Sequence, residues 1–180
     1  MTTISTTERA KQAAEVRKEG SQAQGLDRKV LADLVLEAVR HVGAEELNPP
    51  VTTESSLAFQ PRAMLAMLTY CYANGVYGSE DVEQMMYEDT AFRALCGRDY
   101  PNHRQFRRFR RHNHMVLKRT LEETLRGAWS LNHSPGHNGN GPAKESSNGL
   151  PDPAIQDWIA GEVENRIEKA MFIDQMSIEN

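Results

Sequence analysis

Four arginines stand at helical spacing within the stretch NHRQFRRFRRHNH. They are Arg104, Arg107, Arg108 and Arg111, at positions i, i+3, i+4 and i+7, so a helix would gather them on one stripe. A guanidinium group can bind a guanine edge in the major groove with two hydrogen bonds, and it also pairs well with phosphates. The spacing therefore predicts a helix face that contacts nucleic acid.

The charge around these arginines is distributed in blocks. Residues 97–119 contain eight basic and one acidic side chain, whereas residues 120–180 contain four basic and ten acidic ones, and the formal net charge of the chain is −4. Because local potential rather than total charge attracts a polyanion, the negative total does not exclude nucleic acid. The acidic C-terminal segment could also fold back and compete for the basic stretch.

A plainer interpretation is that the arginine stripe is solvated or paired with acidic neighbours. The nearby acidic residues are Glu80, Asp81, Glu83 and Glu88. The stripe itself has no interleaved carboxylate, so its like charges repel one another unless a polyanion relieves them. We therefore favour a nucleic-acid partner.

Hydrophobic periodicity and capping residues predict the helices that position the stripe. The expected helices span about residues 26–43, 61–75, 79–89, 90–97 and 102–129. Ser79 is expected to cap the third helix, and Asp89 or Thr90 the fourth. Asn102 with Gln105 forms a capping box at the start of the last stretch, which is one long helix or two joined near His112.

Three of these helices, at residues 79–89, 90–96 and 102–111, match the plan of a helix-turn-helix motif. In such motifs the N-terminal part of the last helix meets base edges, and flanking cations bind the backbone. The predicted groove contacts are Asn102, His103, Arg104, Arg107 and Arg108. The predicted phosphate contacts are Arg110, Arg111, Lys118 and Arg119.

The overall prediction is an all-α fold: a compact multi-helix domain with a helix-turn-helix-like unit, a flexible linker and a C-terminal amphipathic helix. The expected boundaries are a frayed or disordered arm at 1–25, the helical domain at 26–129, the linker at 130–150 and the last helix at 151–180. The linker is rich in Gly, Asn, Ser and Pro. Val51 to Thr53 could form a short extended segment.

Several motifs between residues 57 and 128 occur together in one known family. They are Pro61-Arg62 before an apolar helix, Tyr72-Ala73-Asn74-Gly75-Val76, Ser79-Glu80-Asp81-Val82-Glu83, Ala91-Phe92-Arg93-Ala94-Leu95, and His103 followed by Phe109-Arg110. This region resembles the N-terminal domain of bacterial DDE-type insertion-sequence transposases. The resemblance implies a helical domain that recognises transposon-end DNA and assists oligomerisation. The sequence departs from the family pattern at Arg104-Gln105, where a hydroxyl-bearing residue commonly follows the histidine.

In that family an RNase-H-like catalytic fold follows the basic helix, opening with a strand that bears a metal-binding aspartate. Here the segment SPGHNGNGPAKESSNG stands at that place. We therefore expect no catalytic centre, no metal and no cofactor. The combination of His103, His112, His114 and Cys96 matches no structural-zinc spacing, and Cys71 and Cys96 are expected to be reduced core thiols.

The last helix has apolar residues at alternating three- and four-residue steps, the pattern of an amphipathic helix that needs a partner. The residues expected to bind that partner are Ile155, Trp158, Ile159, Val163, Ile167 and Met171. The expected partners are double-stranded DNA and, through this helix, a second copy of the chain or a full-length transposase. No membrane-spanning segment and no small-molecule substrate are expected. The predicted location is the cytoplasm, on the nucleoid when DNA is bound.

Overall fold

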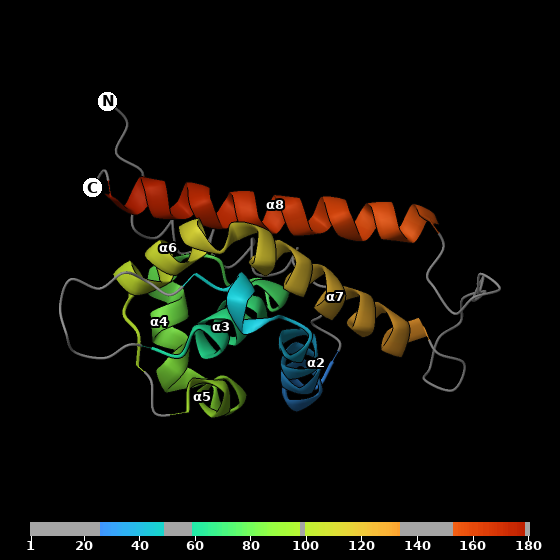
Figure 1. Ribbon diagram of the computed structural model, residues 1–180, viewed down its shortest axis with the longest axis horizontal. Coiled ribbons are helices and arrows are strands. Elements are labelled where there is room, and N and C mark those ends of the chain that lie inside the picture. The colour runs from blue at the N-terminus through green and yellow to red at the C-terminus, as the bar shows by residue number, and fades with distance from the viewer. Residues whose placement is uncertain (1–25, 49–58, 98–99, 134–152, 179–180) are drawn as a thin grey trace, which may run out of the picture.

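The structure is a computed structural model that describes residues 26–48, 59–97, 100–133 and 153–178. All regular structure within these ranges is helical, which confirms the predicted all-α class (Figure 1). The elements are α2 (Arg28–Arg40), the short 3-10 helix η1 (Ala44–Glu46), α3 (Pro61–Ala73), α4 (Ser79–Glu88), α5 (Thr90–Cys96), α6 (His103–His112), α7 (His114–His133) and α8 (Pro153–Ile178). The predicted arm at 1–25, the extended segment at 51–53 and linker residues 134–150 lie outside the described residues.

Helix starts follow the capping chemistry of the sequence, with one exception. The Asp89 carboxylate accepts hydrogen bonds from the N–H groups of Ala91 and Phe92, so Asp89 rather than Thr90 caps α5. Asn102 and Gln105 form the predicted capping box of α6. The expectation that Ser79 caps α4 is wrong, because Ser79 is the first helical residue and the cap position is Gly78, which has no side chain.

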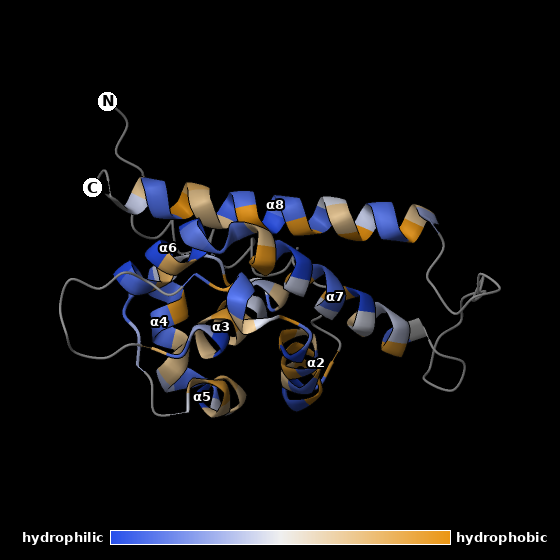
Figure 2. Ribbon diagram, in the orientation of Figure 1, coloured by the Kyte–Doolittle hydropathy of each residue, from blue (hydrophilic) through white to orange (hydrophobic). Residues whose placement is uncertain are grey.

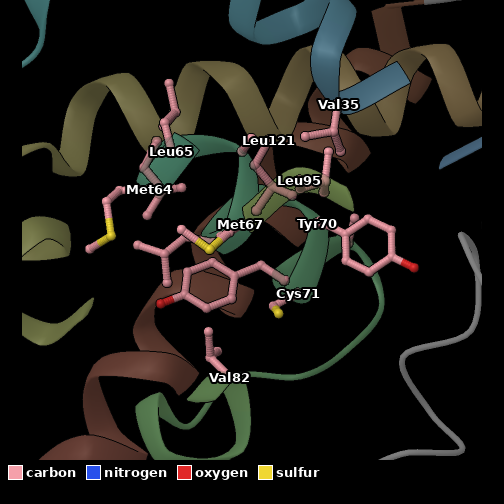
Figure 3. Close-up of a cluster of buried hydrophobic side chains, with 14 of the residues drawn as sticks. Val35, Met64, Leu65, Met67, Tyr70, Cys71, Val82, Leu95 and Leu121 are labelled. Carbon is pink, nitrogen blue, oxygen red and sulfur yellow. The ribbon is translucent and has the colours of Figure 1, made fainter. Parts of the chain in front are cut away.

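Helix α3 forms the centre of the core. Every residue from Met64 to Ala73 is buried, and α3 packs against α2, α4, α5, α6 and α7. Figure 3 shows side chains from several of these helices converging, including Val35, Val82 and Leu121. The breadth of the apolar face predicted this central position.

The basic region is two helices rather than one, because α6 and α7 are separated at Asn113. The Asn113 side chain accepts a hydrogen bond from the Asn48 N–H at 2.8 Å and donates to the Asn48 carbonyl oxygen at 3.0 Å. It also donates to the carbonyl oxygen of Phe109 at 3.0 Å. The buried side-chain amide of Asn113 therefore links the junction between α6 and α7 to Asn48, in the segment that follows η1.

Helix α8 lies across the top of the molecule and runs antiparallel to α7 (Figure 1). Its residues Ile159, Val163, Ile167 and Ala170 are buried in the same hydrophobic cluster as α3. The last helix therefore completes the core of the domain. Among the described residues, no helix is both long enough and apolar enough to span a membrane.

Candidate nucleic-acid interface

Helix α6 separates apolar and basic side chains onto different faces. Phe106 and Phe109 are fully buried where α6 packs on α3 and α4, whereas Arg104, Arg108 and Arg111 are exposed. Figure 2 shows that α6 is largely hydrophilic along its visible surface. This division keeps the helix in the fold while three guanidinium groups face solvent.

Helix α7 adds one further exposed arginine after the junction. Met115 and Arg119 are exposed and follow Arg111 at four-residue steps. We refer to Arg104, Arg108, Arg111 and Arg119 as the outer arginine line. Within the described part of the chain Arg104 and Arg111 make no hydrogen bond or ion pair, while Arg119 pairs with Glu46 at 2.7 Å. The line is therefore a positively charged surface in which the guanidinium groups of Arg104 and Arg111 have no acidic partner among the described residues.

Arg107 does not share the exposed face with the other arginines of α6. Its side chain is 13% exposed and lies between α4 and α8. One guanidinium nitrogen is 3.4 Å from Glu80 Oε1, and Nε is 3.4 Å from Asp174 Oδ2. The expected stripe of four arginines is thus reduced to three, because carboxylates of two neighbouring helices face Arg107.

Arg110 lies in the interior of the protein. Its guanidinium donates to the Tyr72 hydroxyl at 2.7 Å and to the Asp174 carboxylate. Although burial acts to lower the pKa of Arg110, its contacts with Tyr72 and Asp174 raise that pKa on balance. Burial also raises the pKa of Tyr72 to about 12. In this arrangement Arg110 is a structural cation, and a phosphate could reach it only if α8 moved.

Asp174 of α8 is the residue that sequence reasoning missed. Its carboxylate is buried and accepts hydrogen bonds from the Ser79 N–H at 2.8 Å and the Ser79 hydroxyl at 2.6 Å, besides its contacts with Arg107 and Arg110. It therefore supplies the N-terminal cap that Gly78 cannot give to α4. The acidic bias of the C-terminal segment indicated that this region could fold back, but no local pattern identified the carboxylate.

A second buried charge on α8, that of Arg166, binds the C-terminal end of α3, next to the start of α4. Arg166 donates to the carbonyl oxygens of Tyr72 and Ala73, the last two residues of α3, at 2.7 and 2.9 Å. Its Nε also lies 2.7 Å from Glu162 Oε1. Free carbonyls at a helix C-terminus carry partial negative charge, so a cation is favourable there.

The remaining predicted contact residues have partners on neighbouring helices. The backbone N–H and Nδ1 of His103 both lie 2.9 Å from Glu83 Oε2. Partial burial acts to raise the pKa of Glu83, but the hydrogen bonds from His103 lower it on balance. Lys118 pairs with Glu164 of α8, and this hydrogen bond lowers the pKa of Glu164. Asn102 is exposed and caps α6.

The residues predicted to bind a partner divide into two groups. Ile159, Val163 and Ile167 are buried in the intramolecular core, and Ile155 is partly buried against it. Trp158 and Met171 remain 43% and 48% exposed. The apolar face of the last helix therefore binds the domain of its own chain.

No group of three or more His, Cys, Asp or Glu residues in the described segments could hold a metal ion. Cys71 and Cys96 are buried thiols that form no disulfide, and burial raises the pKa of the Cys71 thiol well above its usual range. A buried neutral thiol is a poor nucleophile.

The helices and the outer arginine line define an all-helical domain with a basic helix on its surface. Residues 24–112 match the family model described as a transposase domain (DUF772), which relates this part of the chain to transposases. The match runs through α2 to α6 and leaves α7 and α8 outside. No curated protein and no solved structure matches the chain.

Proposed function

We propose that this chain is a duplex-DNA-binding module of transposase descent, without a catalytic centre of its own. The observation that supports this function best is the outer arginine line. Its cations are exposed, those of α6 lie on successive turns, and within the described residues Arg104 and Arg111 have no carboxylate partner. Like charges at this spacing repel, so a polyanion would stabilise the surface.

The proposed mode resembles that of a helix-turn-helix protein. Helix α6 has ten residues, so it is about 15 Å long, and the major groove is about 12 Å wide. In this mode Asn102, Arg104 and Arg108 lie at the groove. Arg111 and Arg119 then lie beside the phosphates of the groove edge.

The test is a salt titration of binding to random duplex DNA. Arg104→Ala with Arg111→Ala should weaken binding at least about tenfold near 0.1 M salt and lower the slope against log salt by about two. The matched control is Lys29→Ala with Arg40→Ala, which removes the same charge from exposed positions on α2. If both double variants lose affinity equally, binding follows net charge and the assignment to α6 fails.

A second candidate function is association with another copy of the chain or with a full-length transposase through the outer side of α8. The observation that favours it is a set of large apolar side chains left exposed on that helix: Trp158, Met171, Phe172 and Met176. Trp158→Glu with Met171→Glu should abolish such association without lowering the melting temperature. Sedimentation of the wild-type chain as a monomer at all concentrations, with no capture by a transposase, would remove this candidate.

A further inference from the structure

The carboxylate of Asp174 lies in a site made of donors that suit an oxyanion. The site consists of the Ser79 N–H at the start of the ten-residue helix α4, the Ser79 hydroxyl, and the guanidinium groups of Arg107 and Arg110. A helix N-terminus with adjacent cations and a hydroxyl is the usual composition of a phosphate-binding site in proteins. Here a side chain of the same protein occupies it.

The donors of this site exceed what one carboxylate uses. The Nε atom of Arg110 is buried and has no hydrogen-bond partner, and Arg107 Nε approaches Asp174 Oδ2 at 3.4 Å without making a hydrogen bond. Two guanidinium charges and the positive end of α4 face the single buried charge of Asp174, and the exposed Glu80 lies at the rim near Arg107. A phosphate group offers more acceptor oxygens and more negative charge than a carboxylate, so it could satisfy donors that Asp174 leaves unpaired.

The part of α8 that bears Asp174 is held mainly by this polar contact. Beyond Ala170, Asp174 is the only buried side chain among the residues whose side chains are described, and Ile173 is partly buried. The buried apolar anchors Ile159, Val163 and Ile167 all lie earlier in the helix. The last two turns therefore have fewer apolar contacts with the core than the rest of α8 has.

We propose that Asp174 occupies a second DNA-phosphate site, and that a DNA phosphate replaces it when the last two turns of α8 detach. This inference rests on the proposed DNA-binding function. The site adjoins the outer arginine line, because Arg107 precedes Arg108 and follows Arg104 by one turn of α6. Helix α8 thus restrains DNA affinity by competing in cis for the same kind of ligand.

The first arm of the test uses inorganic phosphate and the full chain carrying Asp174→Ala. This variant should melt at a lower temperature than wild type in chloride, because α4 loses its cap and Arg110 loses its carboxylate. Phosphate at matched ionic strength should restore part of the loss in a saturable way. The control is Glu168→Ala, which removes the same charge from an exposed position on α8 and should not respond to phosphate. Absence of a phosphate response in Asp174→Ala would overturn the oxyanion site.

The second arm measures duplex-DNA binding against salt for the same three proteins. Asp174→Ala should bind severalfold more tightly than wild type, because no carboxylate has to be displaced before the phosphate binds, and Glu168→Ala should match wild type. If wild type binds DNA and Asp174→Ala shows no gain over Glu168→Ala, the inference fails and the proposed function stands. If none of the three binds DNA, both fail. Binding by Asp174→Ala alone would support both the inference and the proposed function, because in wild type Asp174 would then block the phosphate site completely.

Discussion

Arg166 and Asp174 lie eight residues apart on α8 and bind the facing ends of two consecutive helices. Arg166 contacts the carbonyl end of α3, and Asp174 contacts the N–H end of α4. Each charge is opposite in sign to the partial charge at the helix end it meets. The corner between α3 and α4 is therefore closed by two residues of α8 that come more than 90 residues after the groups they bind.

Replacing Arg166 with Met should lower the free energy of unfolding by about 3 kcal/mol, because two buried carbonyl oxygens and Glu162 lose their donor. Urea unfolding measures this change. Asn165→Ala is the control, since Asn165 is exposed and adjacent on α8, and its effect should stay within about 0.5 kcal/mol. Equal effects of the two substitutions would show that Arg166 does not anchor α8.

Replacing Asn113 with Ala should cost about 2 kcal/mol, because the Asn48 backbone and the Phe109 carbonyl oxygen lose the amide that joins them. The comparison variant is Met115→Ala, two residues along on the exposed side of α7, which should unfold like wild type. A wild-type unfolding curve for Asn113→Ala would contradict the bridging role.

Acid should weaken the contact between α4 and α6. The pKa of Glu83 is lowered in the folded state, so its contribution to stability is present above the unfolded value of 4.5 and disappears as pH falls through the lower folded pKa. Glu83→Gln should therefore flatten the loss of stability between about pH 5 and pH 3. The measurement is the free energy of unfolding of wild type and of Glu83→Gln over this pH range. Parallel dependence on pH in the two proteins would show that the Glu83–His103 contact is absent in solution.

The two cysteines should resist thiol reagents while the protein is folded. Both are buried, the Sγ atom of Cys96 lies 3.2 Å from the Met67 Sδ atom, and burial raises the pKa of the Cys71 thiol. Ellman's reagent at about pH 8 should react with neither in buffer and with both in denaturant, since the thiolate is the reacting form. Fast reaction in buffer would mean that α3 and α5 do not pack as described.

Local patterns predicted the helices and their caps because those depend on residues within one turn of each other. The Asn102–Gln105 capping box follows from spacing alone, whereas spacing left Asp89 and Thr90 open as the cap of α5 and wrongly assigned Ser79 to the cap of α4. The break at Asn113 needed a contact with Asn48, which lies 65 residues away, so the sequence left one or two helices open.

At the candidate site, too, local patterns could not predict which arginines would be buried by contacts with distant residues. Arg110 and Arg111 are neighbours in sequence, yet one is buried and the other exposed, because α8 covers only one side of α6. Helical periodicity orders side chains around an axis, but it does not say which sector a distant helix will cover. That choice depended on Asp174, whose partners Ser79 and Arg110 lie 95 and 64 residues away.

The late position of Asp174 also sets an order of events during synthesis. Ser79 and Asp174 are 95 residues apart, and a ribosome adds about 5–20 residues per second, so about 5 to 20 s pass before the partner of Ser79 is made. During that interval α4 lacks the carboxylate that caps it, and Arg110, once made, can bind the Tyr72 hydroxyl but has no Asp174 to pair with. The nascent domain is therefore a more basic and less stable molecule than the finished one, and any polyanion nearby meets it in that form first.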